Sequence, residues 1–212
     1  MGAEHLGLGT GHGQQMDATA AATLIAWLDQ EIWLVTAQAG ERRSGLIATF
    51  VNPASIVAEE PRMLVGLARQ HHTWSLVEAS GCLGLHLLAE EHLEWVWRFG
   101  LQSGRDVDKF EGLAFQTRVT GSPLLDEAIG WMDCRVETRL DTGDRTLFLV
   151  EVVESRVTHF APPLTARRLM QLASPAKAAE LARQRHVDSL ADAEAIAAWR
   201  QRPSEPASEP EA

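Results

Sequence analysis

Tyrosine is absent from this chain of 212 residues, and cysteine occurs only twice, as Cys82 and Cys134. Neither cysteine belongs to a Cys-x-x-Cys pair or another metal-type spacing, and each lies in an apolar, strand-like run. Cysteines of this kind are expected to be reduced thiols of the core, as is typical of a cytoplasmic protein. Neither a disulfide scaffold nor a cysteine-ligated metal site is therefore predicted.

Long apolar runs are also absent, since none approaches the roughly 20 residues that span a bilayer. Residues 1–16 are rich in glycine and polar side chains, and lack the basic start and apolar core of a secretory signal. We expect them to form a flexible leader, and residues 203–212 a disordered acidic tail. A cytoplasmic protein without a membrane partner is predicted.

Basic residues are in the minority, with 19 Lys and Arg against 29 Asp and Glu, which gives a formal net charge of -10. Nucleic-acid binding depends on basic side chains that neutralise phosphates. The chain is therefore not expected to bind nucleic acid.

The apolar pattern predicts a mainly β domain over residues 17–160, followed by a helical extension over 161–202. Period-2 alternation after Gly130 and the turn sequence "DTGD", with Gly143 at positive φ, indicate a β-hairpin. No strand-helix-strand repeat is present, so an antiparallel barrel with attached helices fits best. The expected strands are 32–39, 45–56, 61–68, 82–89, 130–140 and 145–157.

Several residues have the chemistry of helix ends. We expect Asp17 to cap a helix that runs to about residue 28, Thr73 to cap a short helix that stops at Gly81, and Gly100 to end a third. In the extension, Ser174 and Pro175 form a typical helix start. The sequence Ser-x-x-Asp at Ser189 resembles a capping box and predicts a further helix.

Two stretches suggest ligand contacts. The strand "RRSGLIATFVNPASI" (42–56) mixes small and polar residues with apolar ones, as if something other than protein lay against its backbone. The segment Arg69–Thr73 runs from a strand into a helix, where free N–H groups and partial positive charge suit a phosphate. The alternative is that Thr73 only caps the helix while His71 and His72 are solvated.

Other chemistries have little support in the sequence. Adjacent residues in an extended segment point to opposite sides, so His71 and His72 are not expected to share a metal ion. No Gly-x-Ser-x-Gly motif is present, and "GLGTGHG" is not preceded by a strand, which argues against a dinucleotide fingerprint. Asp106, Asp108 and Lys109 are interpreted as solvated charges of a polar loop.

The ordered set of segments resembles the flavin reductase-like family, the FMN-binding split barrels, over residues 32–157. The resemblance rests on these segments in this order: "WLVTA", "SGLIATFVNPASIVAEEP", "LVGLARQHHTWSLVEASG", "CLGLHLLAEE", "DKFEGLAFQTRVTGSPLLDEAIGWMDCRVE" and "TGDRTLFLVEVVE". It implies a six-stranded Greek-key split barrel, a homodimer, and FMN bound at or near the dimer interface.

The resemblance also implies the positions of the flavin contacts. The ring would lie against the backbone of Leu46–Thr49, where the small Ala48 permits close approach. Residues of the strand-to-helix loop would hold the phosphate. The implied cofactor-binding residues are Leu46, Ile47, Ala48, Thr49, Ser55, Arg69, Gln70, His72 and Thr73.

The chain departs from the family pattern in several places. Many relatives carry Gly-Asp-His at the last hairpin, whereas this chain has Gly143-Asp144-Arg145. His86 stands where Asn is common, Ile47 replaces a frequent Thr, and the helical C-terminus is extra. Arg145 is our candidate catalytic residue, because its fixed charge could hold an anionic group at the mouth of the site. The structural alternative is an ion pair of Arg145 with Glu137 or Asp141.

The leading functional hypothesis is an FMN oxidoreductase that takes electrons from NAD(P)H and passes them to a protein or small-molecule acceptor. One alternative is a tightly FMN-bound electron-transfer protein that a protein partner reduces. Another is a flavin-binding protein without catalysis. The sequence indicates neither the acceptor nor a preference between NADH and NADPH.

Overall fold

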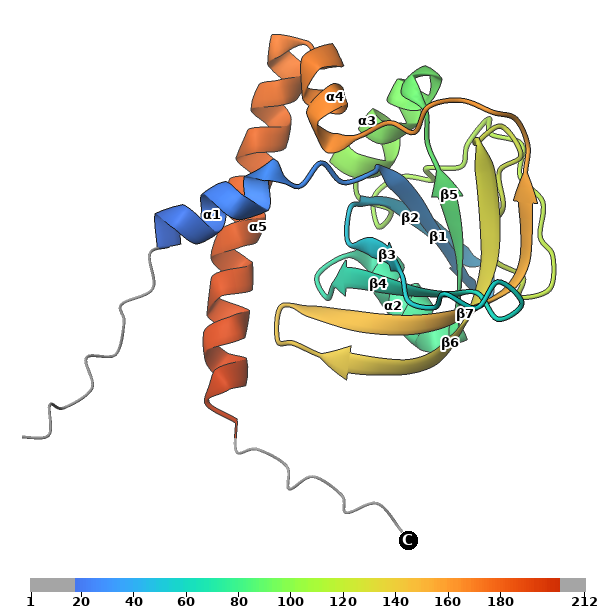
Figure 1. Cartoon of the computed structure of the whole chain (residues 1–212), viewed down its shortest axis with the longest axis horizontal. Helices are drawn as coiled ribbons and strands as arrows, with labels where there is room; N and C mark the ends of the chain where they lie inside the picture. Colours follow the sequence, from blue (N-terminus) through green and yellow to red (C-terminus); the bar gives the residue numbers. More distant parts are fainter. Residues whose placement is uncertain (1–17, 203–212) are drawn as a thin grey trace, which may run out of the picture.

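The computed structural model describes residues 18–202 (Figure 1), a curled antiparallel sheet with helices on its outside. Its strands are β1 (Trp33–Ala39), β2 (Arg42–Ala48), β3 (Val51–Pro53), β4 (Arg62–Ala68), β5 (Cys82–Leu87), β6 (Gly130–Asp141) and β7 (Arg145–Val157). Its helices are α1 (Ala18–Trp27), α2 (His72–Ser80), the 3-10 helix η1 (Glu90–His92), α3 (Leu93–Leu101), α4 (Ala166–Leu172) and α5 (Pro175–Arg200).

The strands form one sheet in the order β2-β1-β5-β6-β7-β4-β3, and every neighbouring pair is antiparallel. The two edge strands, β2 and β3, are joined by only two residues, Thr49 and Phe50. The sheet must therefore curl until its edges approach each other, which produces a half-barrel. This confirms the mainly β, antiparallel prediction.

The prediction of six strands is wrong, because the expected strand over 45–56 is two strands. β2 pairs with β1, whereas β3 pairs with β4. The chain changes partner at Phe50, whose carbonyl accepts a hydrogen bond from the Gly66 N–H at 2.8 Å. The Greek-key arrangement stays a prediction.

Two hydrophobic clusters lie on opposite sides of the sheet. One fills the inside of the curl and includes Val35, Leu67 and Phe148, and the other packs the outside against α3 and α4 and includes Leu34 and Phe99. Consecutive residues of β1 point to opposite faces, so both faces of this strand are covered. Cys82 and Cys134 are free thiols, as predicted, and Cys134 is buried.

His86 is a polar residue of this core, and its hydrogen bonds fix its tautomer. Its Nδ1 lies 3.0 Å from the Leu34 carbonyl, and its Nε2 accepts from the Leu125 N–H at 3.1 Å. Nδ1 must therefore carry the proton. Burial lowers the pKa of His86 to about 4, so the ring is neutral near pH 7.

Some of the predicted helix ends are confirmed. Gly81 ends α2 with φ +67°, Gly143 has φ +95° in the hairpin turn, and the Ser174 side chain caps α5, with Pro175 as its first residue. The expected cap Asp17 lies outside the described residues.

The predicted helix ends at Gly100 and Ser189 are wrong. The third helix continues through Gly100 to Leu101, and α5 is continuous to Arg200 without a new start at Ser189. The Ser189 hydroxyl instead donates back to the His186 carbonyl at 2.8 Å, a bond that a helix interior accommodates.

The long helix α5 stands beside the half-barrel, and the tip of the β6–β7 hairpin points toward it (Figure 1). None of its 26 residues is buried. Over residues 18–202, no helix combines the length and the apolar character needed to cross a membrane.

Candidate ligand-binding site

The outer edge of β2 has backbone groups that no strand pairs with. Lys109 Nζ donates to the Gly45 carbonyl at 2.9 Å, which shows that the backbone of Gly45 faces away from β1. Backbone groups alternate along a strand, so the N–H and C=O of Ile47 face the same way. The side chains of Leu46 and Ala48 are buried, and those of Ile47 and Thr49 are half-buried. The predicted ring-contacting stretch thus offers a backbone donor and acceptor at a sheet edge.

Lys109 anchors the loop that follows α3, and its interpretation as a solvated charge is wrong. It is 5% exposed, and Nζ donates to the carbonyls of Gly45 and Phe99, each at 2.9 Å. Burial lowers the pKa of Lys109 to about 8. The sequence contained one signal for this, the apolar Phe110 directly after the lysine, which is itself buried.

The start of α2 differs from the prediction. The helix begins at His72 and its N-cap is His71, so Thr73 is not the cap. The Thr73 hydroxyl is buried and donates to Ser44 Oγ at 3.2 Å. A hydroxyl has a single proton to donate. Thr73 therefore joins α2 to β2, and in this arrangement its hydroxyl has no proton left to donate to a phosphate.

The side chains of Arg69 and Gln70 point toward the hairpin and α5. Arg69 Nη1 donates to Asp141 Oδ2 at 3.0 Å, and Gln70 Nε2 donates to Asp188 Oδ1 at 3.0 Å. The Arg69 guanidinium also lies 5.4 Å from the centre of the Trp74 ring. Both predicted phosphate contacts thus have acidic partners within the chain.

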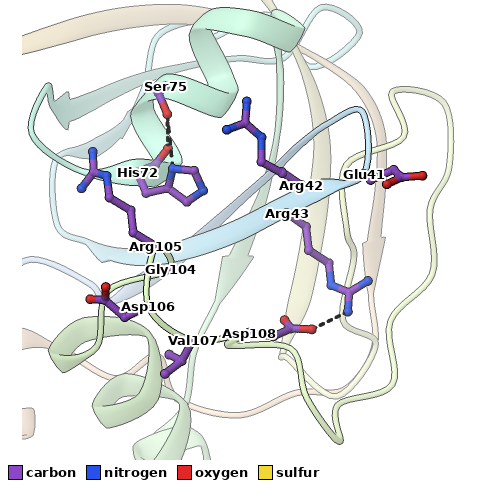
Figure 2. Close-up of a pocket in the computed structure, with 10 residues that line it drawn as sticks. All are labelled: Glu41, Arg42, Arg43, His72, Ser75, Gly104, Arg105, Asp106, Val107 and Asp108. Atoms are coloured by element: carbon purple, nitrogen blue, oxygen red, sulfur yellow. Dashed lines mark hydrogen bonds and ion pairs between the residues drawn. The ribbon is translucent and has the colours of Figure 1, made fainter.

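A pocket of about 700 Å³ lies at the start of α2 (Figure 2), and we call it the basic pocket for its three arginines, Arg42, Arg43 and Arg105. His72 and Ser75 enter it from α2, Arg42 from β2, and Arg105 from the loop after α3. The pocket is lined by Glu41, Arg42, Arg43, His72, Ser75, Gly104, Arg105, Asp106, Val107 and Asp108.

The pocket is lined by as many carboxylates as arginines, but only one of its arginines is paired within the described part of the chain. Among residues 18–202, Arg42 and Arg105 form no ion pair, whereas Arg43 is paired with Asp108 at 2.7 Å. Arg105 Nη1 donates to the Gln70 carbonyl at 3.0 Å. Burial, together with these two arginines, lowers the pKa of His72. The two unpaired arginines are thus the groups of this pocket that could stabilise an anion, although Glu41 and Asp106 line it as well.

Gly104 allows the loop to approach β2 closely. A side chain there would collide with Ser44, the residue that accepts the hydrogen bond from Thr73. The glycine therefore holds Arg105 near the start of α2. Arg42 and Arg105 were missed from the sequence, where each reads as an ordinary surface charge beside a turn.

Arg145 lies at the start of β7, opposite Ala68 of β4. Its Nε donates to Asp144 at 2.6 Å and its Nη2 to Asp192 of α5 at 2.8 Å, while its guanidinium lies 4.6 Å from the centre of the Phe50 ring. The alternative of an ion pair with Glu137 or Asp141 is wrong. Those carboxylates pair instead with Arg62, Arg69 and Arg202.

Most of the predicted site residues come together. The Arg69 N–H donates to the Asp144 carbonyl at 3.1 Å, and Arg145 contacts Phe50, the neighbour of Thr49. The β2 edge, the start of α2 and the hairpin therefore meet in one region. Ser55 is placed differently. Its hydroxyl accepts a local hydrogen bond from the Val57 N–H at 3.0 Å rather than contacting another predicted site residue.

Comparison with protein families gives a match to the flavin reductase like domain over residues 27–171. The chain is 30% identical over 136 residues to the ferric-chelate reductase (NAD(P)H) of Archaeoglobus fulgidus, covering 63% of this chain and 79% of that protein. It is 28% identical over 152 residues to the high molecular weight rubredoxin of Moorella thermoacetica, covering 71% of this chain and 64% of that longer protein.

Solved structures show the same fold. The flavin reductase domain protein from Arthrobacter sp. FB24 aligns with a TM-score of 0.61 at 24% sequence identity. The alignment covers 70% of this chain and 91% of that chain. The shared part is therefore shorter than this chain.

Proposed function

Because the chain belongs to the flavin reductase-like domain family, we propose that it is an oxidoreductase that binds FMN and reduces it with NAD(P)H. The observation that carries this proposal is the pocket in which Arg42 and Arg105, without acidic partners in the described structure, flank His72 at the start of α2. Such a site suits a dianionic phosphate monoester, the group that distinguishes FMN from riboflavin.

The residues present fit a flavin at both of its ends. The Ile47 backbone offers a donor and an acceptor to the pyrimidine edge of the ring, and Thr49 and the half-exposed Phe50 continue this edge. Arg42, His72 and Arg105 would hold the phosphate, with Ser75 beside them. A bound flavin supplies the redox chemistry, while the protein supplies binding and orientation. Arg69, Gln70 and Thr73 would then hold the segment between β4 and α2 in place rather than contact the phosphate.

Arg145 is proposed to receive the anionic part of the electron donor. It lies against Phe50, at the point where the β2 edge and the hairpin meet. Arginine keeps its charge at all physiological pH values and cannot act as a proton donor there. Its role would therefore be to bind and orient the donor. The ferric-chelate reductase relative carries NAD(P)H in its name, which supports a nicotinamide donor for this chain.

A homodimer is part of the proposal. The exposed fractions of Leu24, Ile25, Trp27 and Leu28, in and just after α1, lie between 58% and 69%. An isolated helix of ten residues is marginal in water, and contiguous apolar surface of this kind is typical of an interface. A second copy of the chain is the partner that we expect to cover it.

A second candidate function is electron transfer with tightly held FMN, in which a protein partner reduces the flavin. The observation that favours it is the cover that α5 places over Arg145 and Gln70, which restricts access by a small donor. The name of the Moorella relative, a rubredoxin, also belongs to electron transfer. The acceptor remains a proposal in both cases, as a protein or a small molecule.

The two candidates are separated by anaerobic titration of the FMN-loaded protein with NADH and with NADPH, followed by absorption at the flavin bands. The reductase proposal expects bleaching within one equivalent of at least one of the two nicotinamides. Retention of the oxidised spectrum with both would favour the electron-transfer candidate. Purified protein that takes up no flavin would contradict both candidates.

A further inference from the structure

Polar contacts hold α5 against the proposed site. Asp188 Oδ1 accepts from Gln70 Nε2 at 3.0 Å, and Asp192 Oδ2 accepts from Arg145 Nη2 at 2.8 Å. Just after the helix, Arg202 Nη1 donates to Asp141 Oδ2 at 3.0 Å. No side chain of α5 is buried, so hydrophobic burial contributes little to this attachment.

The tip of the β6–β7 hairpin packs closely against α5. A Cβ at Gly143 would lie 2.6 Å from Trp199 Cβ and 2.9 Å from the Ala195 carbonyl oxygen. The tip and the last turns of α5 therefore approach each other as closely as a glycine allows. This places Asp192, two turns before Trp199, directly over Arg145.

Asp192 is held at an electrostatic cost. Its Oδ1 is buried without a hydrogen-bond partner, and burial raises the pKa of its carboxyl group, with Asp144 and Asp188 adding to this. It shares Arg145 with Asp144, which sits 2.6 Å from the guanidinium. A carboxylate with one unsatisfied oxygen and a shared cation gains less than a fully paired one. An anion that pairs more completely with Arg145 can therefore replace Asp192.

We propose that α5 is a displaceable cover, in which the Asp192 carboxylate occupies the place of a substrate phosphate at Arg145. Asp188 and Asp192 together put negative charge where an anionic substrate would arrive. A phosphate-bearing donor must therefore move α5 aside before it reaches Arg145. The identity of that donor rests on the proposed function, whereas the cover itself does not.

Chemical modification of Arg145 tests the cover without any flavin. The folded full chain is treated with phenylglyoxal, and the rate of adduct formation at Arg145 is followed by peptide mass spectrometry. In Asp192→Ala we expect this rate to rise at least about tenfold over the wild type, the effect of losing one charge-assisted hydrogen bond. Inorganic pyrophosphate, added as the probe anion, should slow the modification in this variant.

Glu194→Ala is the matched control, because it removes the same charge from an exposed position of the same helix, and it should leave the rate at Arg145 unchanged. Asp192→Asn, which keeps the size of the side chain, should give an intermediate rate. Wild-type rates in Asp192→Ala, or no protection by pyrophosphate, would overturn the proposal. Failure of the protein to bind flavin would instead count against the proposed function and leave this result standing.

Discussion

The Thr73 hydroxyl donates to Ser44 Oγ at 3.2 Å, and this bond joins the start of α2 to the edge strand β2 inside the fold. Arg42, two residues before Ser44, and His72, the residue before Thr73, line the same basic pocket. The bond therefore sets the spacing between the two elements from which the proposed phosphate contacts extend.

Thr73→Val should lower stability while leaving the preference for FMN over riboflavin intact. Valine keeps the shape of the side chain but leaves the buried Ser44 hydroxyl without its donor, which costs about 1 kcal/mol. Urea unfolding gives the stability, and fluorescence titration with both flavins gives the preference. If the variant instead lost its preference for FMN at unchanged stability, the Thr73 hydroxyl would be a phosphate contact.

Arg105→Gln and Arg42→Gln should each weaken FMN binding about tenfold and leave riboflavin binding unchanged, because each removes one charge from the basic pocket that is proposed to hold the phosphate. Arg98→Gln is the matched control. Arg98 also donates to a backbone carbonyl, that of Glu111, but does not line this pocket. Equal losses for FMN and riboflavin would show that the arginines act on the fold rather than on the phosphate.

Arg145→Ala should leave FMN binding nearly intact but slow reduction by NAD(P)H at least about tenfold, equivalent to roughly 1.4 kcal/mol in the barrier. The reason is that Arg145 lies against Phe50, at the mouth of the proposed site, rather than in the basic pocket. Stopped-flow reduction under anaerobic conditions measures this rate. An unchanged rate would assign Arg145 only to the attachment of α5.

Lys109 should make stability rise with pH in the alkaline range. Its pKa is about 8 in the fold and has an ordinary value of 10.5, so the unfolded chain binds more protons between these values. The penalty for burying the charged form is complete below pH 8 and disappears as the pH approaches 10.5. The change amounts to about 3 kcal/mol.

This effect is measured as the difference in unfolding free energy between the wild type and Lys109→Met, by urea titration from pH 7 to pH 10. The free energy of unfolding of the wild type should increase relative to that of the variant as the pH rises. The same comparison with Lys177→Met, on α5, is the control and should show no such trend. A flat difference for Lys109 would mean that its ammonium group is solvated in solution.

The sequence predicted the antiparallel sheet and the hairpin, because these depend on local signals. Period-2 alternation indicated β6, and the glycine of the turn sequence indicated the turn at Gly143, where φ is positive. The phosphate contacts stay a prediction, and the sequence could not show which charged side chains have partners, because that depends on how each side chain is oriented in the fold. Arg69 and Arg105 are both charged loop residues, and only the fold shows that the first pairs with Asp141 whereas the second forms no ion pair among residues 18–202 and donates to the Gln70 carbonyl.

Long-range partners explain the remaining errors. The sequence alone favours a solvated Lys109, because its acceptors, the carbonyls of Gly45 and Phe99, belong to other elements. The sequence suggested carboxylates of its own hairpin as ion-pair partners of Arg145. One of its partners is instead Asp192 of α5, a helix that lies outside residues 32–157, the part that resembles the family. The strand over 45–56 was drawn as one because nothing local marks the change of partner at Phe50.

The central claim, a basic pocket that recognises a flavin phosphate, is tested most directly by the ratio of the dissociation constants of riboflavin and FMN for the wild-type protein. Both are obtained by the same fluorescence titration at one fixed ionic strength. The account predicts that FMN binds at least about tenfold more tightly, the contribution of a single charge-assisted contact. Equal affinity for the two flavins would contradict it.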